Sequence, residues 1–308
     1  MNISRFVGLG VPGILLCLFP CDSAAAAGRA PAKPVALVYS LAGRAELALS
    51  TKERRSLRLF DRLAAGTTLE VGPGSRLSLA FANGHRYELG PQSRAVLGPA
   101  DLTARSGPVQ ALPAVPPLPG LVPIAEDENP GLRAGAVRVR TERIAGLYPR
   151  HGTAALAGAT VLRFAPVEGA GTYRIEVQDR EGNIVFTTET EVFAVSLPAR
   201  TLKPGLRYDW TVRTVNRVGP VAQGAEDFLT LSSSFSKARE KLRKAVEKEK
   251  DGGSLALLAE VDRGLGLLAE ARDELRAAVR SAPGDAALAE ALTALEKHVE
   301  EVSFASKN

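Results

Sequence analysis

Apolar and polar residues alternate along several short runs in the first third of the chain. In the stretch RLSLAF, Leu77, Leu79 and Phe81 fall on one face of an extended chain, and the residues between them fall on the other. The Asn83-Gly84 pair that follows predicts a two-residue β-hairpin turn. About five to eight short strands of this kind predict a small antiparallel β roll or sandwich over residues 28–110. The runs that carry the pattern are 35–43, 45–49, 67–71, 75–84, 85–90 and 93–98.

A second alternating region occupies residues 136–231. Tyr173, Ile175 and Val177 fall on one face of its longest early run, which predicts an antiparallel β-sandwich. Trp210 stands on another alternating run, and we interpret it as a core residue rather than a platform for stacking a sugar. The turn residues that separate these runs lie at 181–183 and 203–205.

The apolar period changes to that of a helix after residue 231. Phe235, Ala238, Leu242 and Val246 recur at helical spacing among Lys and Glu side chains that pair at i, i+4, so this run predicts an amphipathic helix with a solvated charged face rather than a polyanion-binding helix. Further apolar repeats predict a C-terminal helical bundle over 232–308. The expected fold class is therefore mainly β with an α-helical tail.

Residues 111–135 separate the two β regions. Four prolines between 113 and 119 favour an extended, semi-rigid linker. The acidic run Glu126, Asp127 and Glu128 lacks the spacing of a calcium-binding loop, so we interpret it as a solvated part of the linker.

The first 27 residues have the pattern of an export signal. Arg5 precedes an apolar run at 6–20, and small residues allow cleavage near Ala26 or Ala27. Cleavage predicts a periplasmic or secreted protein, and retention of the segment as an anchor is the alternative. Both cysteines, at 17 and 21, lie inside this segment, so the mature chain is expected to contain neither a disulfide nor a thiolate site.

Positive charge is concentrated ahead of the second β region. The 308-residue chain has a formal net charge of +5, and the strongest basic cluster consists of Lys52, Arg54, Arg55, Arg58 and Arg62. Such a cluster is a candidate interaction patch for an acidic envelope polymer or an acidic envelope protein. A solvated loop that keeps the domain soluble is the alternative. Nucleic acid is an unfavourable partner, because aromatic residues are not interleaved with the basic ones.

Residues that could carry catalysis are sparse. His85, His151 and His298 lie in three different predicted domains, and none is part of a metal-binding or triad motif. We therefore predict a protein without catalytic residues, cofactor or metal. A hydrolase acting on envelope polysaccharide is a further alternative; it needs paired carboxylates in one cleft, whereas we expect the carboxylates to scatter over strands and helices.

The first β region carries a pattern of glycines and apolar residues at Gly43, Leu63, Gly66, Leu69, the run from Gly72 to Gly84 and the run from Tyr87 to Leu97. On these positions it resembles the FecR domain, which is named for the periplasmic part of a bacterial iron-uptake regulator. The resemblance covers residues 35–110 and implies a periplasmic protein-interaction or sensing module without an active site. Iron-uptake regulators of that family have a cytoplasmic anti-sigma segment and a membrane helix before the domain, whereas an export signal is expected here.

The later regions resemble two further families. The stretch from Leu202 to Gly219 is similar to fibronectin type III, and this implies that the hydroxyl of Tyr208 ties its strand to the preceding turn. Residues 254–285 carry a second pattern, at Leu255, Leu258, Ala259, Gly266, Ala271, Leu275, Ala278 and Pro283. This pattern resembles a single tetratricopeptide repeat, with Asp262 standing where that family usually has a bulky aromatic residue.

These features together predict an exported, non-catalytic binding or scaffold protein of the cell envelope that contacts a membrane only indirectly. The alternative is a periplasmic component of a FecR-type signalling system, for iron uptake or envelope sensing, that acts through a membrane partner. The sequence does not indicate an oligomeric state.

Overall fold

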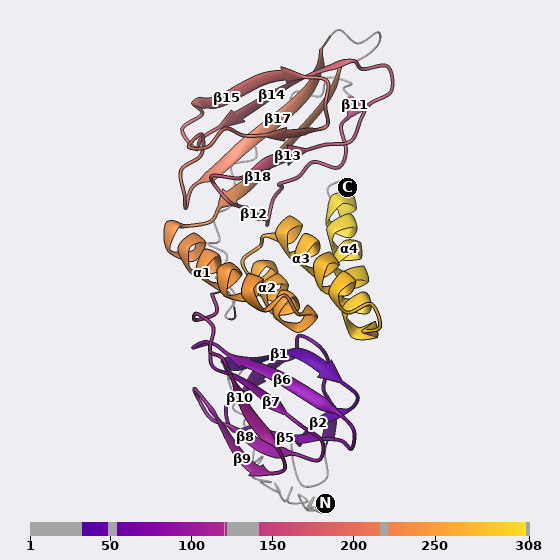
Figure 1. Ribbon diagram of the computed structural model, residues 1–308. Helices are drawn as coiled ribbons and strands as arrows, with labels where there is room; N and C mark the ends of the chain where they lie inside the picture. The colour runs from indigo at the N-terminus through magenta and orange to yellow at the C-terminus, as the bar shows by residue number, and fades with distance from the viewer. Residues whose placement is uncertain (1–32, 49–53, 120, 122–141, 216–220, 306–308) are drawn as a thin grey trace, which may run out of the picture. The chain divides into compact units, whose positions relative to one another are not determined.

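The computed structural model describes residues 33–48, 54–119, 121, 142–215 and 221–305. The predicted export segment, Lys52, the acidic run of the linker and the alternating run 136–141 lie outside the described residues. Strands dominate the chain up to residue 231 and four helices follow it, so the coarse fold class is confirmed (Figure 1).

The first β domain contains two five-stranded sheets in which every strand pair is antiparallel. One sheet has the order β10-β7-β6-β1-β4 and the other β3-β2-β5-β8-β9, and a shared apolar core joins them. The strands are β1 (Pro34–Ala42), β2 (Ala45–Ala48), β3 (Arg54–Ser56), β4 (Arg62–Ala64), β5 (Thr68–Val71), β6 (Arg76–Phe81), β7 (Arg86–Leu89), β8 (Arg94–Leu97), β9 (Leu102–Ser106) and β10 (Val109–Leu112).

Each of the six predicted runs contains a strand, but the described part of this domain holds ten strands, more than expected. The predicted hairpin joins β6 to β7, although its loop is one residue longer than expected. The amide of Phe81 donates to the carbonyl oxygen of His85, so three residues, ending at Gly84 with φ +91°, connect the strands. A glycine in the left-handed region at the end of a three-residue loop is a common hairpin solution.

Strand β6 is buried on both faces, which its alternation did not predict. Leu77, Leu79 and Phe81 face the core between the two sheets, as expected. Ala80 on the opposite face belongs to a different core, together with Leu37 of β1 and several helical residues. The outer face of the β10-β7-β6-β1-β4 sheet is therefore covered by protein rather than by solvent around Leu37 and Ala80.

The second β domain pairs a six-stranded sheet with a two-stranded one. The larger sheet has the order β11-β18-β17-β14-β15, with β12 also paired to β18, and the smaller consists of β13 and β16. Side chains from both sheets form one core, as in a β-sandwich. The strands are β11 (Glu142–Arg143), β12 (Ala154–Ala155), β13 (Val161–Arg163), β14 (Thr172–Gln178), β15 (Ile184–Thr190), β16 (Ala194–Ser196), β17 (Arg207–Val215) and β18 (Ala222–Thr230).

Aromatic residues of β17 anchor this core in the way the sequence predicts. Trp210 is buried, and its indole N–H donates to the carbonyl oxygen of Pro149 at 2.8 Å. The hydroxyl of Tyr208 accepts the amide hydrogen of Lys203 at 2.8 Å, which ties the strand to the preceding turn. Gly182 and Gly205 adopt positive φ at the predicted turns.

Four helices form the tail: α1 (Ser233–Glu249), α2 (Gly252–Gly264), α3 (Leu268–Ser281) and α4 (Ala286–Ala305). Side-chain oxygens cap the first two, since Ser232 accepts from the amide of Phe235 and Asp251 accepts from that of Ser254. Gly266, with φ +79°, reverses the chain between α2 and α3. Among the described residues, no helix combines the length and apolar character needed to cross a bilayer.

The helical tail packs against the first β domain instead of standing apart from it. Leu242 and Val246 of α1 and Leu257 and Leu258 of α2 share a core with Tyr39 of β1. The predicted linker also differs from expectation: it begins inside β10, and Val115, Leu118 and Leu121 are buried in the same core. Apolar side chains between the prolines therefore make this part of the segment a packed element. A further helical core holds α2, α3 and α4 together.

Candidate functional site

An open groove of about 650 Å³ lies where the first β domain meets the helices. Its wall on the β side comes from β1 and the β3–β4 loop (57–61), and its helical wall comes from α2, α3 and α4. Most of the lining is apolar, with charged groups among the apolar ones. The lining residues are Leu41, Leu57, Arg58, Leu59, Phe60, Ala259, Glu260, Arg263, Leu275, Ala287, Glu290, Ala291, Ala294, Leu295 and His298.

The buried carboxylate of Glu260 holds the two walls of the groove together where the first β domain meets α2. The side chain of Glu260 on α2 is only 1% exposed, and its oxygens accept from Arg263 one turn later on the same helix at 2.6 and 2.7 Å. Arg62 of β4 reaches the same carboxylate at 3.3 Å and donates to the carbonyl oxygen of Leu121 at 2.9 Å. These contacts bind the β domain, the segment after β10 and α2 to one another.

The predicted basic patch is divided by the fold. Arg54 on β3 pairs with Glu70 at 2.5 Å and with Glu46 at 3.5 Å. Arg55 pairs with Asp61 at 3.4 Å, and the backbone amide of Arg58 donates to the same carboxylate. The side chain of Arg58 lines the groove, and that of Arg62 is committed to Glu260. The described arginines therefore do not form one uniform cationic surface.

Arg86 fastens the tail to the β domain, a role that sequence reasoning missed. Its side chain is 2% exposed and binds Glu249 at the end of α1 through two guanidinium nitrogens at 2.5 and 2.7 Å. It also donates to the carbonyl oxygen of Pro113 and to the hydroxyl of Ser254 in α2. Glu249 accepts hydrogen bonds from Arg86 and from the hydroxyl of Ser254, and these bonds lower its pKa, chiefly the one from Arg86. The sequence does show an arginine on a predicted strand next to a hairpin. The residues around it do not indicate which distant residues it binds.

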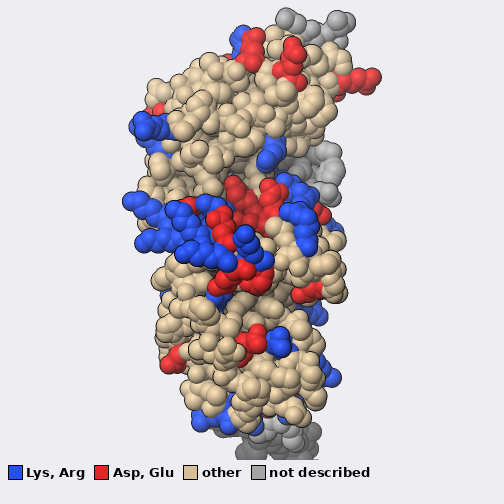
Figure 2. Space-filling view, viewed as in Figure 1, with Lys and Arg blue, Asp and Glu red and all other residues tan. Residues whose placement is uncertain are grey.

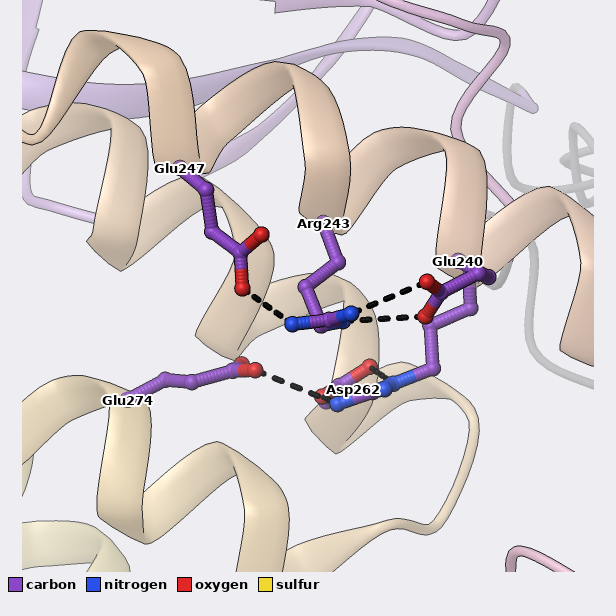
Figure 3. Close-up of polar contacts among 6 residues, drawn as sticks. Glu240, Arg243, Glu247, Asp262 and Glu274 are labelled. Atoms are coloured by element: carbon purple, nitrogen blue, oxygen red, sulfur yellow. Dashed lines mark hydrogen bonds and ion pairs between the residues drawn. The ribbon is translucent and has the colours of Figure 1, made fainter.

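A second buried cluster fixes α1 on α2 and α3 (Figure 3). Arg239 of α1 donates to both oxygens of Asp262 at 2.7 and 2.5 Å and to Glu274 of α3 at 3.1 Å. Burial, followed by the nearby charge of Asp262, raises the pKa of Glu274 to about 10, so this carboxyl holds a proton at neutral pH. Burial likewise raises the pKa of Asp262 against the opposing effect of Arg239. The tetratricopeptide resemblance implied a bulky aromatic residue at position 262. This chain has an aspartate there, and it binds Arg239 inside the helical core.

The carboxylates are less scattered than expected. Asp262 and Glu274 converge on Arg239, so the expectation fails for this pair. Both carboxyls face an arginine in the helical core, and neither lines the groove. Glu260 and Glu290 do line it, but Glu260 is held in ion pairs with Arg62 and Arg263.

The three histidines occupy different surroundings. His85 contacts Asn83 in the hairpin, and His298 lines the groove. His151 lies 2.9 Å from Asp227, a His–carboxylate pair that its 76-residue separation concealed in the sequence. Asp227 also binds Arg207 at 2.5 Å. Within the described ranges, no group of three or more His, Cys, Asp or Glu side chains is arranged to hold a metal ion.

Comparison with known proteins finds no matching family model and no matching curated protein. Solved structures with fibronectin type III domains are weakly similar over part of the chain. "Structure of FN3tt mut" is 16% identical over 28% of this chain and 92% of its own, with a TM-score of 0.21. A two-domain fibronectin type III segment from chicken tenascin is 11% identical over 65% and 94%, with a TM-score of 0.24. CopC from Methylosinus trichosporium OB3b is 20% identical over 29% and 93%, with a TM-score of 0.22.

Proposed function

We propose that this chain is an exported, non-catalytic binding or scaffold protein of the cell envelope, and that its groove holds an apolar segment of a partner protein. The observation that carries the proposal is the groove itself, because the first β domain and the helical tail both contribute its walls. Leucine and alanine side chains line most of it, and Arg58 and Glu290 supply charges of both signs. A peptide segment with an apolar stripe and polar flanks complements such a lining.

The fixed geometry of the walls supports this role. Ion pairs from Arg62 and Arg86 hold the helices on the β domain, and the Arg239 cluster holds α1 on α2 and α3. A groove whose walls are already in place binds without a large ordering cost. These charged clusters hold the walls together, and the groove between the walls stays open to another molecule.

The sequence resemblances support an interaction role as well. Glycines of the FecR-like pattern, including Gly43 and Gly66, have positive φ at turns, which is the backbone conformation that such a pattern requires. Six of the eight residues that match a tetratricopeptide repeat lie on α2 and α3, and Ala259, Ala271 and Leu275 pack in the core between these helices. The export signal is the reason for assigning the protein to the envelope.

The test is site-specific photo-crosslinking in intact cells. A photoreactive amino acid at Ala294, which is exposed and lines the groove, is compared with one at Ala289, which is exposed on the same helix outside it. We expect a discrete envelope protein to crosslink from position 294 only, and a chain with Ala291→Trp, which fills the groove, to lose that product. Identical crosslinks from both positions would contradict the proposal, and so would turnover of an envelope substrate by the pure protein.

The identity of the partner separates the two forms of the proposal. An inner-membrane regulator as the crosslinked protein supports a FecR-type signalling component. A periplasmic or outer-envelope protein supports a scaffold.

A further inference from the structure

Helix α1 carries a row of lysines on the side opposite its buried face. Lys237, Lys241, Lys244 and Lys248 follow one another at intervals of four, three and four residues, and all four are exposed. At about 100° per residue they fall within an arc of about 60°, and at about 1.5 Å per residue the row is about 16 Å long. Leu242 and Val246 lie roughly on the opposite side of the helix and are buried.

In the described part of the chain, few ion pairs neutralise this row. Among the described residues, Lys244 is the only one of the four with an ion pair, to Glu240 at 3.5 Å. Arg243 takes up both acidic neighbours, since it binds Glu240 at 2.9 Å and also pairs with Glu247 (Figure 3). The remaining acidic residue of the helix, Glu249, is bound by Arg86. The carboxylates of α1 are therefore committed to arginines.

The arginines of the first β domain make an informative contrast. Arg44, Arg54, Arg76 and Arg94 are each more than half exposed, yet each pairs with Glu46, Glu70 or Glu88. Figure 2 shows the largest gathering of basic side chains on the visible face over the region of α1, with acidic side chains beside it. Among the described residues, fewer ion pairs therefore neutralise the lysine row than neutralise Arg54, Arg55 and Arg62 of the predicted cluster.

The chemistry of the row indicates the class of partner. Lysine ammonium groups are compact, strongly hydrated point charges that attract phosphate without requiring a fixed bidentate geometry. Neighbouring lysines are separated by about 4.5 to 6 Å along the helix axis, so successive charges of a flexible chain can meet successive ammonium groups. The described exposed large apolar residues all lie outside α1, so the helix offers nothing to insert into lipid.

The i, i+4 pairing of Lys with Glu that favoured a merely solvated face for this helix is found, among the described residues of the row, only at Lys244, so that interpretation is revised. We propose that the lysine row of α1 binds a flexible linear polymer that carries a phosphate group on each repeat. The attraction is electrostatic and weakens with salt. Four phosphate contacts correspond to a salt slope of roughly −2.8, and so to a roughly fiftyfold loss of affinity between about 50 and 200 mM salt. Assigning the polymer to the envelope rests on the proposed function, whereas the binding itself does not.

The test uses short-chain inorganic polyphosphate and the full chain with all four lysines changed to Gln. This variant keeps good helix-forming residues at exposed positions. We expect its affinity to fall at least tenfold at about 50 mM salt and its salt slope to approach zero. The matched control changes Arg44, Arg54, Arg76 and Arg94 to Gln, which alters net charge equally, and we expect it to bind nearly as the parent does.

A second variant acts in the opposite direction. Glu240→Gln together with Glu247→Gln releases Arg243 beside the row, and we expect affinity for polyphosphate to rise roughly twofold or more. Ala291→Trp fills the groove and should leave this binding unchanged, so failure of the groove proposal and failure of this one are distinguishable.

Equal losses of polyphosphate affinity in the lysine and arginine variants would overturn the inference. Tighter binding to anionic phospholipid vesicles than to polyphosphate, at equal phosphate, would overturn it in favour of a membrane surface.

Discussion

Individual charged residues have roles that depend on partners far away in the sequence. Arg62 was predicted in a surface patch, yet it binds Glu260 on α2, 198 residues later. No sequence pattern singled out Arg86 or Arg239, although both are buried and each forms an ion pair with a residue far away in the sequence. Composition and spacing predicted where basic residues gather, but not which carboxylates the fold brings to them. The candidate site was consequently the least predictable part of the molecule.

At the residue scale, Glu274→Gln should change how stability depends on pH. The pKa of Glu274 is raised in the folded chain by burial and by Asp262, with a smaller contribution from Glu270, against the opposing effect of Arg239. Between the ordinary carboxyl pKa and about 10 the unfolded chain binds fewer protons at this group, so stability falls as pH rises. Glutamine cannot ionise and removes that loss.

We therefore expect the Glu274→Gln chain to melt at a similar or lower temperature than the parent near pH 4 and several degrees higher near pH 9, given roughly 2–4 °C per kcal/mol for a domain of this size. Thermal unfolding followed by circular dichroism across this range is the measurement. Glu290→Gln, at an exposed position on α4, is the control and should show no such trend. A parallel pH trend in the two variants would mean that Glu274 is ionised in the folded chain.

At the element scale, alternation predicted the strands that have one buried face and a turn on each side. Alternation did not predict strand β9, because four of its five residues are exposed. It did not predict strand β3 either, because all three residues of that strand are exposed. These edge strands are defined by backbone pairing with a neighbour, which leaves no apolar pattern to detect. Strand β6 shows the reverse limitation: its alternation located one core but not the helices that bury its other face.

The β6–β7 hairpin also makes close contact with the segment after β10. A Cβ at Gly84 would lie 1.9 Å from the carbonyl oxygen of Val115, and the residue has φ +91°. Gly74 has φ +67°, but a Cβ there meets no atom within 4 Å. Gly74→Ala should therefore cost about 1 kcal/mol for its left-handed backbone, and Gly84→Ala should cost about 1–3 kcal/mol more for the displaced segment. Urea unfolding of both variants measures the difference, and equal losses would show that the segment yields freely.

At the scale of the whole molecule, the helical tail is part of the first domain's structure. The sequence pattern placed the tail and the first β domain in separate domains, because the helical period begins some 120 residues after the end of the β domain that the helices cover. Leu37 and Tyr39 of β1 lie beneath α1 and α2, and burial raises the pKa of the Tyr39 hydroxyl to about 12. A chain that ends at Leu231 exposes this face, so removing the tail alters the β domain as well as any docking element.

Polar substitutions on that face of β1 should consequently have opposite effects in the truncated chain and in the full chain. In the chain that ends at Leu231, Leu37→Thr with Tyr39→Thr removes an exposed apolar patch while retaining good strand formers, and we expect it to suppress self-association and dye binding. In the full chain the same pair removes buried packing against the helices and should destabilise it by about 2–5 kcal/mol for each residue. Light scattering, 8-anilinonaphthalene-1-sulfonate fluorescence and urea unfolding of the four proteins measure these effects. If the truncated chain is monomeric and does not bind the dye without the substitutions, the helices do not cover this face.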